Sequence, residues 1–187
     1  MIDYVLIGMV LNEPLTGYDI KKYIEVSIGN FFKVSYGNLY PALKKLADKG
    51  FLTTEEEMQG NRIKKYYQAT ELGKAEFLEW LSAPADFSAK LQAFMVKIFF
   101  FGELPENIRK QRFYECELYI QQGLQKLNKM KEQYEHFSSE SDRAYFEVAT
   151  LHYAIQNGLH SLRWIRYIKE KGPLSEFLQG GNYETEI

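Results

Sequence analysis

The stretch S35-Y-G-N-L-Y-P-A-L-K-K-L-A-D-K-G50 decides the fold of the N-terminal half of this chain. Leu39, Leu43 and Leu46 recur at the spacing of an amphipathic helix and fall on one face of it, which we expect to be buried. The stretch opens with a serine, a preferred N-cap residue, and closes with a glycine, which suits the left-handed residue after a helix. The sequence therefore predicts a helix between these two residues.

Two poor helix formers, Gly37 and Pro41, lie on the outward stripe of this helix, opposite the leucines. A proline near the start of a helix removes few hydrogen bonds, and a glycine lets another backbone approach closely. Two interpretations stay open. Either the start of the helix is simply bent, or its outward face is built to be approached by a partner.

The segments around this helix complete a recognisable arrangement. A first apolar helix covers 2–11, Thr16 caps a second helix, 51–57 and 62–70 form a β-hairpin, and Thr70 caps a fourth helix to about residue 81. Three small helices followed by a two-stranded hairpin form a winged helix-turn-helix, in which the third helix is presented to a DNA groove and the hairpin reaches alongside.

The pattern changes at 82–89, where a proline and small residues interrupt it, and long helical segments follow. We therefore expect a mainly α chain with a small β-hairpin. A winged helix-turn-helix DNA-binding domain is expected over 1–83 and a helical dimerisation domain over 89–187.

Basic residues gather on the two elements that would meet DNA. The whole chain has a formal net charge of -2, whereas 21–65 contains nine basic and five acidic residues. Any single lysine on a helix is most simply a solvated one, but this co-location favours phosphate contacts. Glu55, Glu56 and Glu57 occupy the first hairpin strand, which we expect on the far side of the hairpin, away from DNA.

Hydroxyl and amide groups at the start of the third helix suit contacts to both phosphates and base edges. The predicted DNA-contacting residues are Ser35, Tyr36, Asn38, Tyr40, Lys44, Lys45, Arg62, Lys64 and Lys65.

The composition argues against an enzyme, a metal site and a membrane protein. The single cysteine, Cys116, lies on an apolar helical stripe, and the three histidines are scattered, so neither a catalytic nor a metal constellation is predicted. The sequence also contains no phosphate-binding glycine loop, and we expect no cofactor.

No apolar window is long enough to span a bilayer, and the short apolar N-terminus is interpreted as a core helix. A reducing cytoplasm is the expected location.

Three motifs in this order resemble the PadR family of bacterial transcriptional regulators. They are L15-T-G-Y-D-I20, S35-Y-G-N-L-Y-P-A-L-K-K-L46 and K65-Y-Y-Q-A-T-E-L-G73. The resemblance implies that the third helix and the hairpin named above face an operator. The length of the chain and the segment 93–102 also resemble the longer-tailed members, which include repressors of phenolic acid stress genes.

The second half predicts a dimer. Two helices of roughly 45 Å, over 105–137 and 142–171, are too long to be buried by the small first domain. The first is predicted to carry a helical stripe of Cys116, Ile120, Leu124, Leu127, Tyr134 and Phe137. The second is predicted to carry Val148, His152, Ile155, Leu159, Leu162, Ile165 and Ile168. Packing of the two helices within one chain is the alternative. We favour a homodimer through the C-terminal helices, because a two-fold dimer reading a pseudo-palindromic operator doubles the DNA contacts.

The second half is also rich in aromatic residues, which usually form core. Because some longer-tailed PadR relatives bind an aromatic acid between their domains, the resemblance implies a site for a small aromatic effector. Its predicted residues are Phe94, Lys97, Tyr153 and His160. A winged-helix module that binds proteins rather than DNA is the alternative function, and it predicts apolar residues on the third helix and the hairpin.

Overall fold

The computed structural model describes residues 1–60, 62–85, 91–135 and 142–179, without the side chains of 62, 91–92, 134–135 and 178–179. The chain divides into two compact units, Met1–Glu106 and Asn107–Ile187. The elements of the first unit are α1 (Ile2–Met9), β1 (Leu15–Thr16), α2 (Gly17–Ser27), α3 (Tyr36–Asp48), β2 (Leu52–Gln59), β3 (Arg62–Ala69), α4 (Glu71–Ser82), α5 (Leu91–Phe99) and the 3₁₀ turn η1 (Phe101–Glu103). Those that follow are α6 (Glu106–Glu135), α7 (Asp142–Lys169) and α8 (Leu174–Gln179).

The two predicted threonine caps and the glycine after the third helix are confirmed, whereas the first helix ends at Met9 rather than at residue 11. The Thr16 hydroxyl accepts a hydrogen bond from the Asp19 N–H at 3.2 Å, and the Thr70 hydroxyl accepts one from the Gly73 N–H at 3.0 Å. Each threonine thereby satisfies one of the N–H groups that a helix start leaves without a partner. Gly50 follows α3 with a φ of +73°, the left-handed conformation expected of the residue after a helix.

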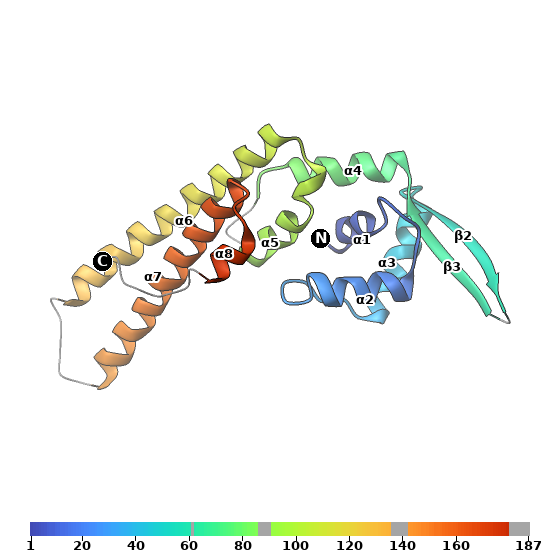
Figure 1. Cartoon of the computed structure of the whole chain (residues 1–187). Coiled ribbons are helices and arrows are strands. Elements are labelled where there is room, and N and C mark those ends of the chain that lie inside the picture. Colours follow the sequence, from blue (N-terminus) through green and yellow to red (C-terminus); the bar gives the residue numbers. More distant parts are fainter. Residues whose placement is uncertain (61, 86–90, 136–141, 180–187) are drawn as a thin grey trace. The chain divides into compact units, whose positions relative to one another are not determined.

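The first unit also contains a three-stranded antiparallel sheet of order β1-β3-β2. Its two long strands, β2 and β3, are seen in Figure 1. The predicted hairpin is β2 and β3, with Leu52 opposite Ala69 and Gln59 opposite Arg62. Gly60 takes a φ of +62° in the turn between the strands. Strand β1 was not predicted from the sequence, because a segment of two residues is too short to show a periodic pattern.

The core of the first unit lies between α1, α3 and α4. The side chains of Leu39 and Leu43 are fully buried and that of Leu46 is 1% exposed, which confirms the predicted face of α3. Helix α3 packs on α1 and α2, and α4, whose Phe77 is fully buried, packs on α1. Together with the hairpin, these helices confirm the predicted mainly helical winged helix-turn-helix, with further helices after it.

Helix α5 and η1 are part of this first unit. The Lys97 ammonium donates hydrogen bonds to the main-chain oxygens of Trp80 at 2.7 Å and Ala83 at 2.9 Å, at the carboxyl end of α4. The ring of Phe100 meets that of Phe77 edge to face, 5.2 Å between centroids. The compact unit therefore extends to Glu106, and the functional domain bounds of 1–83 and 89–187 stay a prediction.

The second unit is built on α6 and α7, which lie side by side (Figure 1). The Glu117 carboxylate of α6 accepts hydrogen bonds from Lys169 at 2.6 Å and Arg166 at 3.3 Å, both from α7. Gly158 of α7 lies so close to α6 that a Cβ there would stand 2.7 Å from Leu124. None of the helices in the described part of the chain could span a membrane.

The predicted apolar stripes are only partly buried. On α6 the buried residues include Cys116, Ile120 and Leu124, as expected. On α7 the buried line is Leu151, Ile155, Leu162 and Ile165, whereas His152 and Leu159 of the predicted stripe are exposed. Tyr134 and Phe137, also placed on the α6 stripe, lie outside the described side chains.

Candidate nucleic-acid interface

The outward face of α3 is polar and open to solvent. Gly37, Pro41 and Lys44 form the line opposite the buried leucines, and all three are exposed. The predicted contact residues on this helix and its N-cap are exposed as well: Ser35, Tyr36, Asn38, Tyr40, Lys44 and Lys45. The whole predicted set from the third helix is therefore open to solvent, on the outward line of α3 and its two flanks.

The fold has no internal need for glycine at position 37. A Cβ placed there would have the Ser35 Oγ, 3.8 Å away, as its nearest neighbour. Alanine is the better helix former by roughly 1 kcal/mol, so glycine costs stability at this position without relieving a clash inside the chain. This observation favours the interpretation that the outward face of α3 is approached by a partner.

Two tyrosines form a ridge beside this line. The rings of Tyr36 and Tyr40, one helical turn apart, stack with 6.1 Å between centroids and 15° between planes. They are 45% and 46% exposed, so about half of each side chain stays open to solvent. Ser35 precedes them as the N-cap residue, and its side chain makes no capping hydrogen bond, unlike Thr16 and Thr70.

The two lysines of α3 differ in their surroundings. Lys45 donates a hydrogen bond to the Asp3 carboxylate of α1 at 2.6 Å, forming an exposed ion pair. Lys44 makes no ion pair within the described residues. A phosphate would therefore compete with Asp3 for Lys45, whereas Lys44 is available without that competition.

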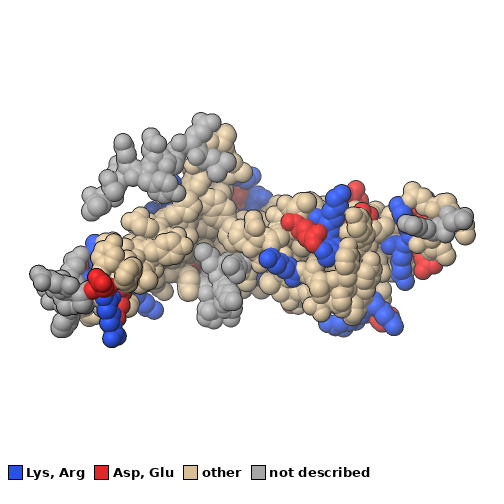
Figure 2. Space-filling view, turned by 90° about the horizontal axis from the view of Figure 1, so that it is seen from below, with Lys and Arg blue, Asp and Glu red and all other residues tan. Residues whose placement is uncertain are grey.

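The lysines of the hairpin stand directly opposite glutamates. In the register of β2 and β3, Glu56 pairs with Lys65 and Glu57 with Lys64, and the Lys65 ammonium lies 3.9 Å from the Glu56 carboxylate. Residues directly opposite each other in antiparallel strands share a face. The glutamates and lysines of the hairpin therefore neighbour each other, and the placement of β2 away from DNA stays a prediction. Figure 2 shows basic and acidic side chains adjoining at the end where the hairpin projects. Arg62 begins β3, and its side chain lies outside the described residues.

The four predicted effector residues are distributed over both units. Phe94 and Lys97 lie in the first unit; Phe94 is 2% exposed and packs edge to face on Phe101, 5.6 Å between centroids. The hydrogen bonds of Lys97 to the end of α4 give this side chain a structural task. Tyr153 and His160 lie on α7 in the second unit, and both are exposed. The effector site stays a prediction.

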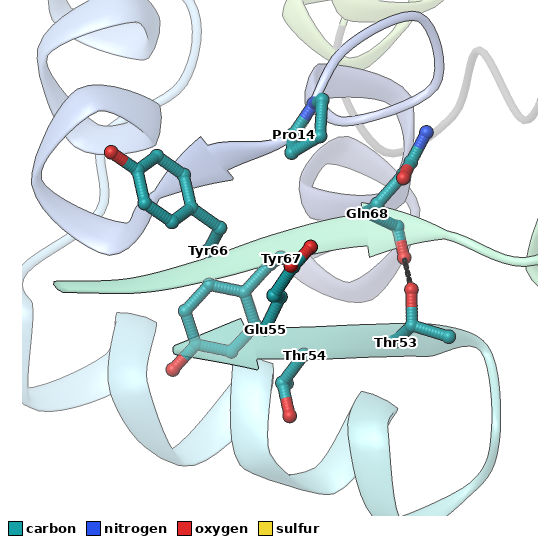
Figure 3. A pocket seen from close by; sticks show the side chains of 7 residues that line it. All are labelled: Pro14, Thr53, Thr54, Glu55, Tyr66, Tyr67 and Gln68. Atoms are coloured by element: carbon teal, nitrogen blue, oxygen red, sulfur yellow. Dashed lines mark hydrogen bonds between the residues drawn. The ribbon is translucent and has the colours of Figure 1, made fainter. Parts of the chain in front are cut away.

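A pocket of about 250 Å³ lies on the sheet of the first unit (Figure 3). Its lining is a mixture of polar and apolar surface, and the Thr53 hydroxyl donates a hydrogen bond to the Gln68 main-chain oxygen at 3.4 Å. The lining residues are Pro14, Thr53, Thr54, Glu55, Tyr66, Tyr67 and Gln68. This set contains none of the four predicted effector residues.

The cysteine has the properties of a core residue. Cys116 is fully buried, and burial, followed by the charge of Glu117, raises the pKa of its thiol from 9.0 to about 12. Since the thiolate is the reactive form, this thiol is a poor nucleophile at neutral pH. Within the described residues, no group of three or more histidine, cysteine, aspartate and glutamate side chains could hold a metal ion.

Comparison with known proteins identifies the family. The model of the transcriptional regulator PadR-like family matches residues 6–79. The negative transcriptional regulator PadR of Bacillus subtilis (strain 168) is 32% identical over 138 residues, which cover 72% of this chain and 74% of that protein. Similar solved structures include Bacillus subtilis PadR in complex with operator DNA, 29% identical with a TM-score of 0.44, covering 90% of this chain and 95% of that chain. Another is the same protein in complex with p-coumaric acid, 27% identical with a TM-score of 0.40, covering 90% of this chain and 96% of that chain.

The winged helix-turn-helix and these matches define the class of the protein, which is a transcriptional regulator. Within that class, the chain belongs to the PadR-like family. Members of this family are transcriptional regulators and not enzymes.

Structure adds three residues that the sequence did not suggest for this region. Asp3 holds Lys45, and Gly17 and Lys21 of α2 lie against the two tyrosines of α3. In the sequence, only Gly17 of L15-T-G-Y-D-I20 hinted at these contacts, because glycine is a poor helix former and stands at the first position of a helix.

Proposed function

We propose that this regulator is a homodimeric repressor whose protomers each place α3 in a groove of a pseudo-palindromic operator, with the hairpin alongside. The observation that carries the proposal is the outward face of α3, which is polar, exposed and has a glycine that the fold does not require. Repression is supported by the similarity to a negative transcriptional regulator. In this proposal, 1–83 is the DNA-binding domain and 89–187 the dimerisation domain.

The contacts are divided by chemistry. Lys44, Lys64 and Lys65 meet phosphates and set affinity, since lysine carries charge but little sequence information. Asn38 and Tyr40 reach base edges, where amide and hydroxyl groups discriminate between bases. Arg62 and Lys45 add basic charge at the hairpin and on the flank of α3, and Ser35 and Tyr36 contact the backbone at the start of the helix.

The second unit supports dimerisation through its uncovered apolar surface. α6 and α7 bury a shared line of side chains, yet large aromatic residues on both helices stay exposed, with Tyr145 at 70% and Tyr153 at 71%. Isolated exposed apolar residues are ordinary, but several on two long helices are typical of an interface. A second copy of the same helices is the partner that a two-fold operator requires.

Release by a small aromatic acid is the regulatory part of the proposal, and it follows from the family resemblance. Tyr153 and His160 are the members of the predicted set with exposed side chains. We expect an aromatic acid to weaken operator binding in a gel shift, with benzoate-sized and larger phenolic acids compared at equal concentration. Unchanged operator binding across that series would remove this part of the proposal and leave DNA binding untouched.

Operator binding itself is tested with lysine variants in a gel shift against the DNA upstream of the gene and its neighbours. Lys44→Gln is expected to weaken binding to all sequences alike and to reduce the slope of log affinity against log salt by about 0.9 for each phosphate that the variant no longer neutralises. Lys74→Gln, an exposed lysine on α4, is the matched control and is expected to keep the wild-type slope.

The alternative function makes the opposite prediction for the same experiment. A winged helix that binds proteins would show weak, salt-independent retention on heparin and no shifted operator. It would also be expected to present an apolar α3, whereas the outward line of α3 includes Lys44 beside exposed Asn38 and Ser35. The observed face therefore favours DNA.

A further inference from the structure

We propose that Lys21 and Gly17 of α2 are positioning residues that hold the Tyr36–Tyr40 pair of α3 in the arrangement in which it meets operator DNA. This inference rests on the proposed DNA-binding function and adds two residues that lie outside the predicted contact set. It joins the motif L15-T-G-Y-D-I20 to the motif that begins at Ser35 as one packing unit.

Lys21 holds the first ring. Its ammonium lies 4.7 Å from the centroid of the Tyr36 ring, within the range of a cation–π interaction. The same ammonium is paired with the Glu25 carboxylate one turn further along α2, so its position is held from two sides. The Lys21 side chain is only 15% exposed, and most of its surface is therefore taken up by packing.

Gly17 makes room for the second ring. A Cβ at this position would stand 2.6 Å from the Tyr40 Cε1 atom and 3.3 Å from its hydroxyl oxygen. The Tyr40 ring therefore occupies the space that any other residue at position 17 would fill. Because the conflict is with a side chain, a larger residue at this position would displace the ring before it displaced the backbone.

The two contacts act on one stack. Tyr36 packs against Lys21, Tyr40 against Gly17, and the rings stack on each other, so movement of either ring disturbs both. An exposed tyrosine that is free to rotate loses side-chain entropy when a partner fixes it. Side chains already held by α2 lose less, and they present the same surface to every DNA molecule. Lys21 and Gly17 thereby improve both the affinity and the discrimination of α3.

The test measures affinity, sequence discrimination and salt dependence for the full chain. Lys21→Met is expected to weaken operator binding about two- to fivefold, the size of an exposed cation–π contact, and to reduce the ratio between operator and base-substituted operator. Lys21→Arg keeps a cation over the ring and is expected to restore both. Gly17→Ala is expected to lower the same ratio by about tenfold, since it moves the ring of Tyr40.

Salt dependence separates positioning from direct binding of phosphate. Positioning predicts that Lys21→Met keeps the wild-type slope of log affinity against log salt, whereas removal of a lysine that neutralises a phosphate would lower that slope by about 0.9. A lower slope, or an unchanged discrimination ratio, would overturn the proposal. Lys22→Met, an exposed neighbour on α2, controls for the change in charge. In a Tyr36→Leu background, Lys21→Met is expected to have no further effect, because the ring that it holds is absent.

A measurement without DNA keeps this inference separate from the proposed function. In aromatic NMR spectra of the free protein, Lys21→Met and Gly17→Ala are expected to shift the ring resonances of Tyr36 and Tyr40, with thermal stability close to wild type. Absent shifts would overturn the packing unit even if the operator is bound. A wild-type protein that binds no operator, with the shifts present, would instead remove the proposed function.

Discussion

Gly73→Ala is expected to lower the free energy of unfolding by about 3 kcal/mol or more, at the upper end of what overpacking costs. Gly73 lies buried in the first turn of α4, directly against the main chain that leaves α3. A Cβ there would stand 2.1 Å from the Phe51 main-chain oxygen and 2.9 Å from the carbonyl carbon. No rotamer change relieves a clash with backbone.

The Phe51 backbone is also unable to move aside cheaply. Its oxygen accepts hydrogen bonds from the Thr70 N–H at 3.1 Å and from the Thr70 hydroxyl at 3.2 Å. The same hydroxyl lies 2.7 Å from the Gly50 oxygen and accepts the Gly73 N–H that caps α4. Displacing Phe51 would break the junction at which α3, β2 and α4 meet, and we therefore expect global destabilisation.

Urea unfolding followed by circular dichroism, at equal protein concentrations, measures this effect. Gly37→Ala is the matched control, because it is also a glycine in the first turn of a helix but has no neighbour within 3.8 Å. It is expected to leave stability unchanged or to raise it by up to about 1 kcal/mol. Equal urea midpoints for wild type and Gly73→Ala would contradict the packing described for α4.

Removal of residues 107–187 is expected to leave a folded monomer that binds the operator roughly 10²–10⁴-fold more weakly than the full chain. Linking two DNA-binding modules converts the second contact into an intramolecular one, and a gain of that size is typical. The shortened chain keeps α5 and η1, and with them the Lys97 hydrogen bonds to α4 and the Phe100–Phe77 contact. We therefore expect its winged helix to remain intact.

Light scattering and gel shifts on a full operator and on one half-site check this prediction. On a half-site the shortened and full-length proteins should bind almost alike, because only one module is engaged. A second truncation after residue 83 is the structural control. It removes the cover of Phe77, which is fully buried in the full chain, and is expected to be markedly less stable. If residues 1–106 bind the full operator as tightly as the whole chain, dimerisation does not contribute to DNA binding.

Much of the first unit was predictable because its signals are local. The threonine caps of α2 and α4 involve partners three residues away, and the leucine face of α3 repeats within two turns. The hairpin likewise forms between neighbouring segments. Interactions of this range depend on spacing along the chain, and spacing is what a sequence displays directly.

The candidate interface was predictable as a list of exposed residues, but its internal order was not. The sequence indicated the polar face of α3, and the structure shows that Lys45 is paired with Asp3, 42 residues away. It also shows Lys65 opposite Glu56, which follows from strand register. The sequence identifies these lysines by their charge, whereas their ion-pair partners depend on how the elements pack.

By itself, the sequence determined a winged helix-turn-helix of the PadR-like family, because caps, apolar periods and turn residues act over a few positions. The tertiary structure alone decided which side chains share a surface. It brought Lys97 to the end of α4, and it set Gly17 and Lys21 against the two tyrosines of α3. These contacts join residues on different elements, and their geometry exists only once the core has fixed how those elements pack.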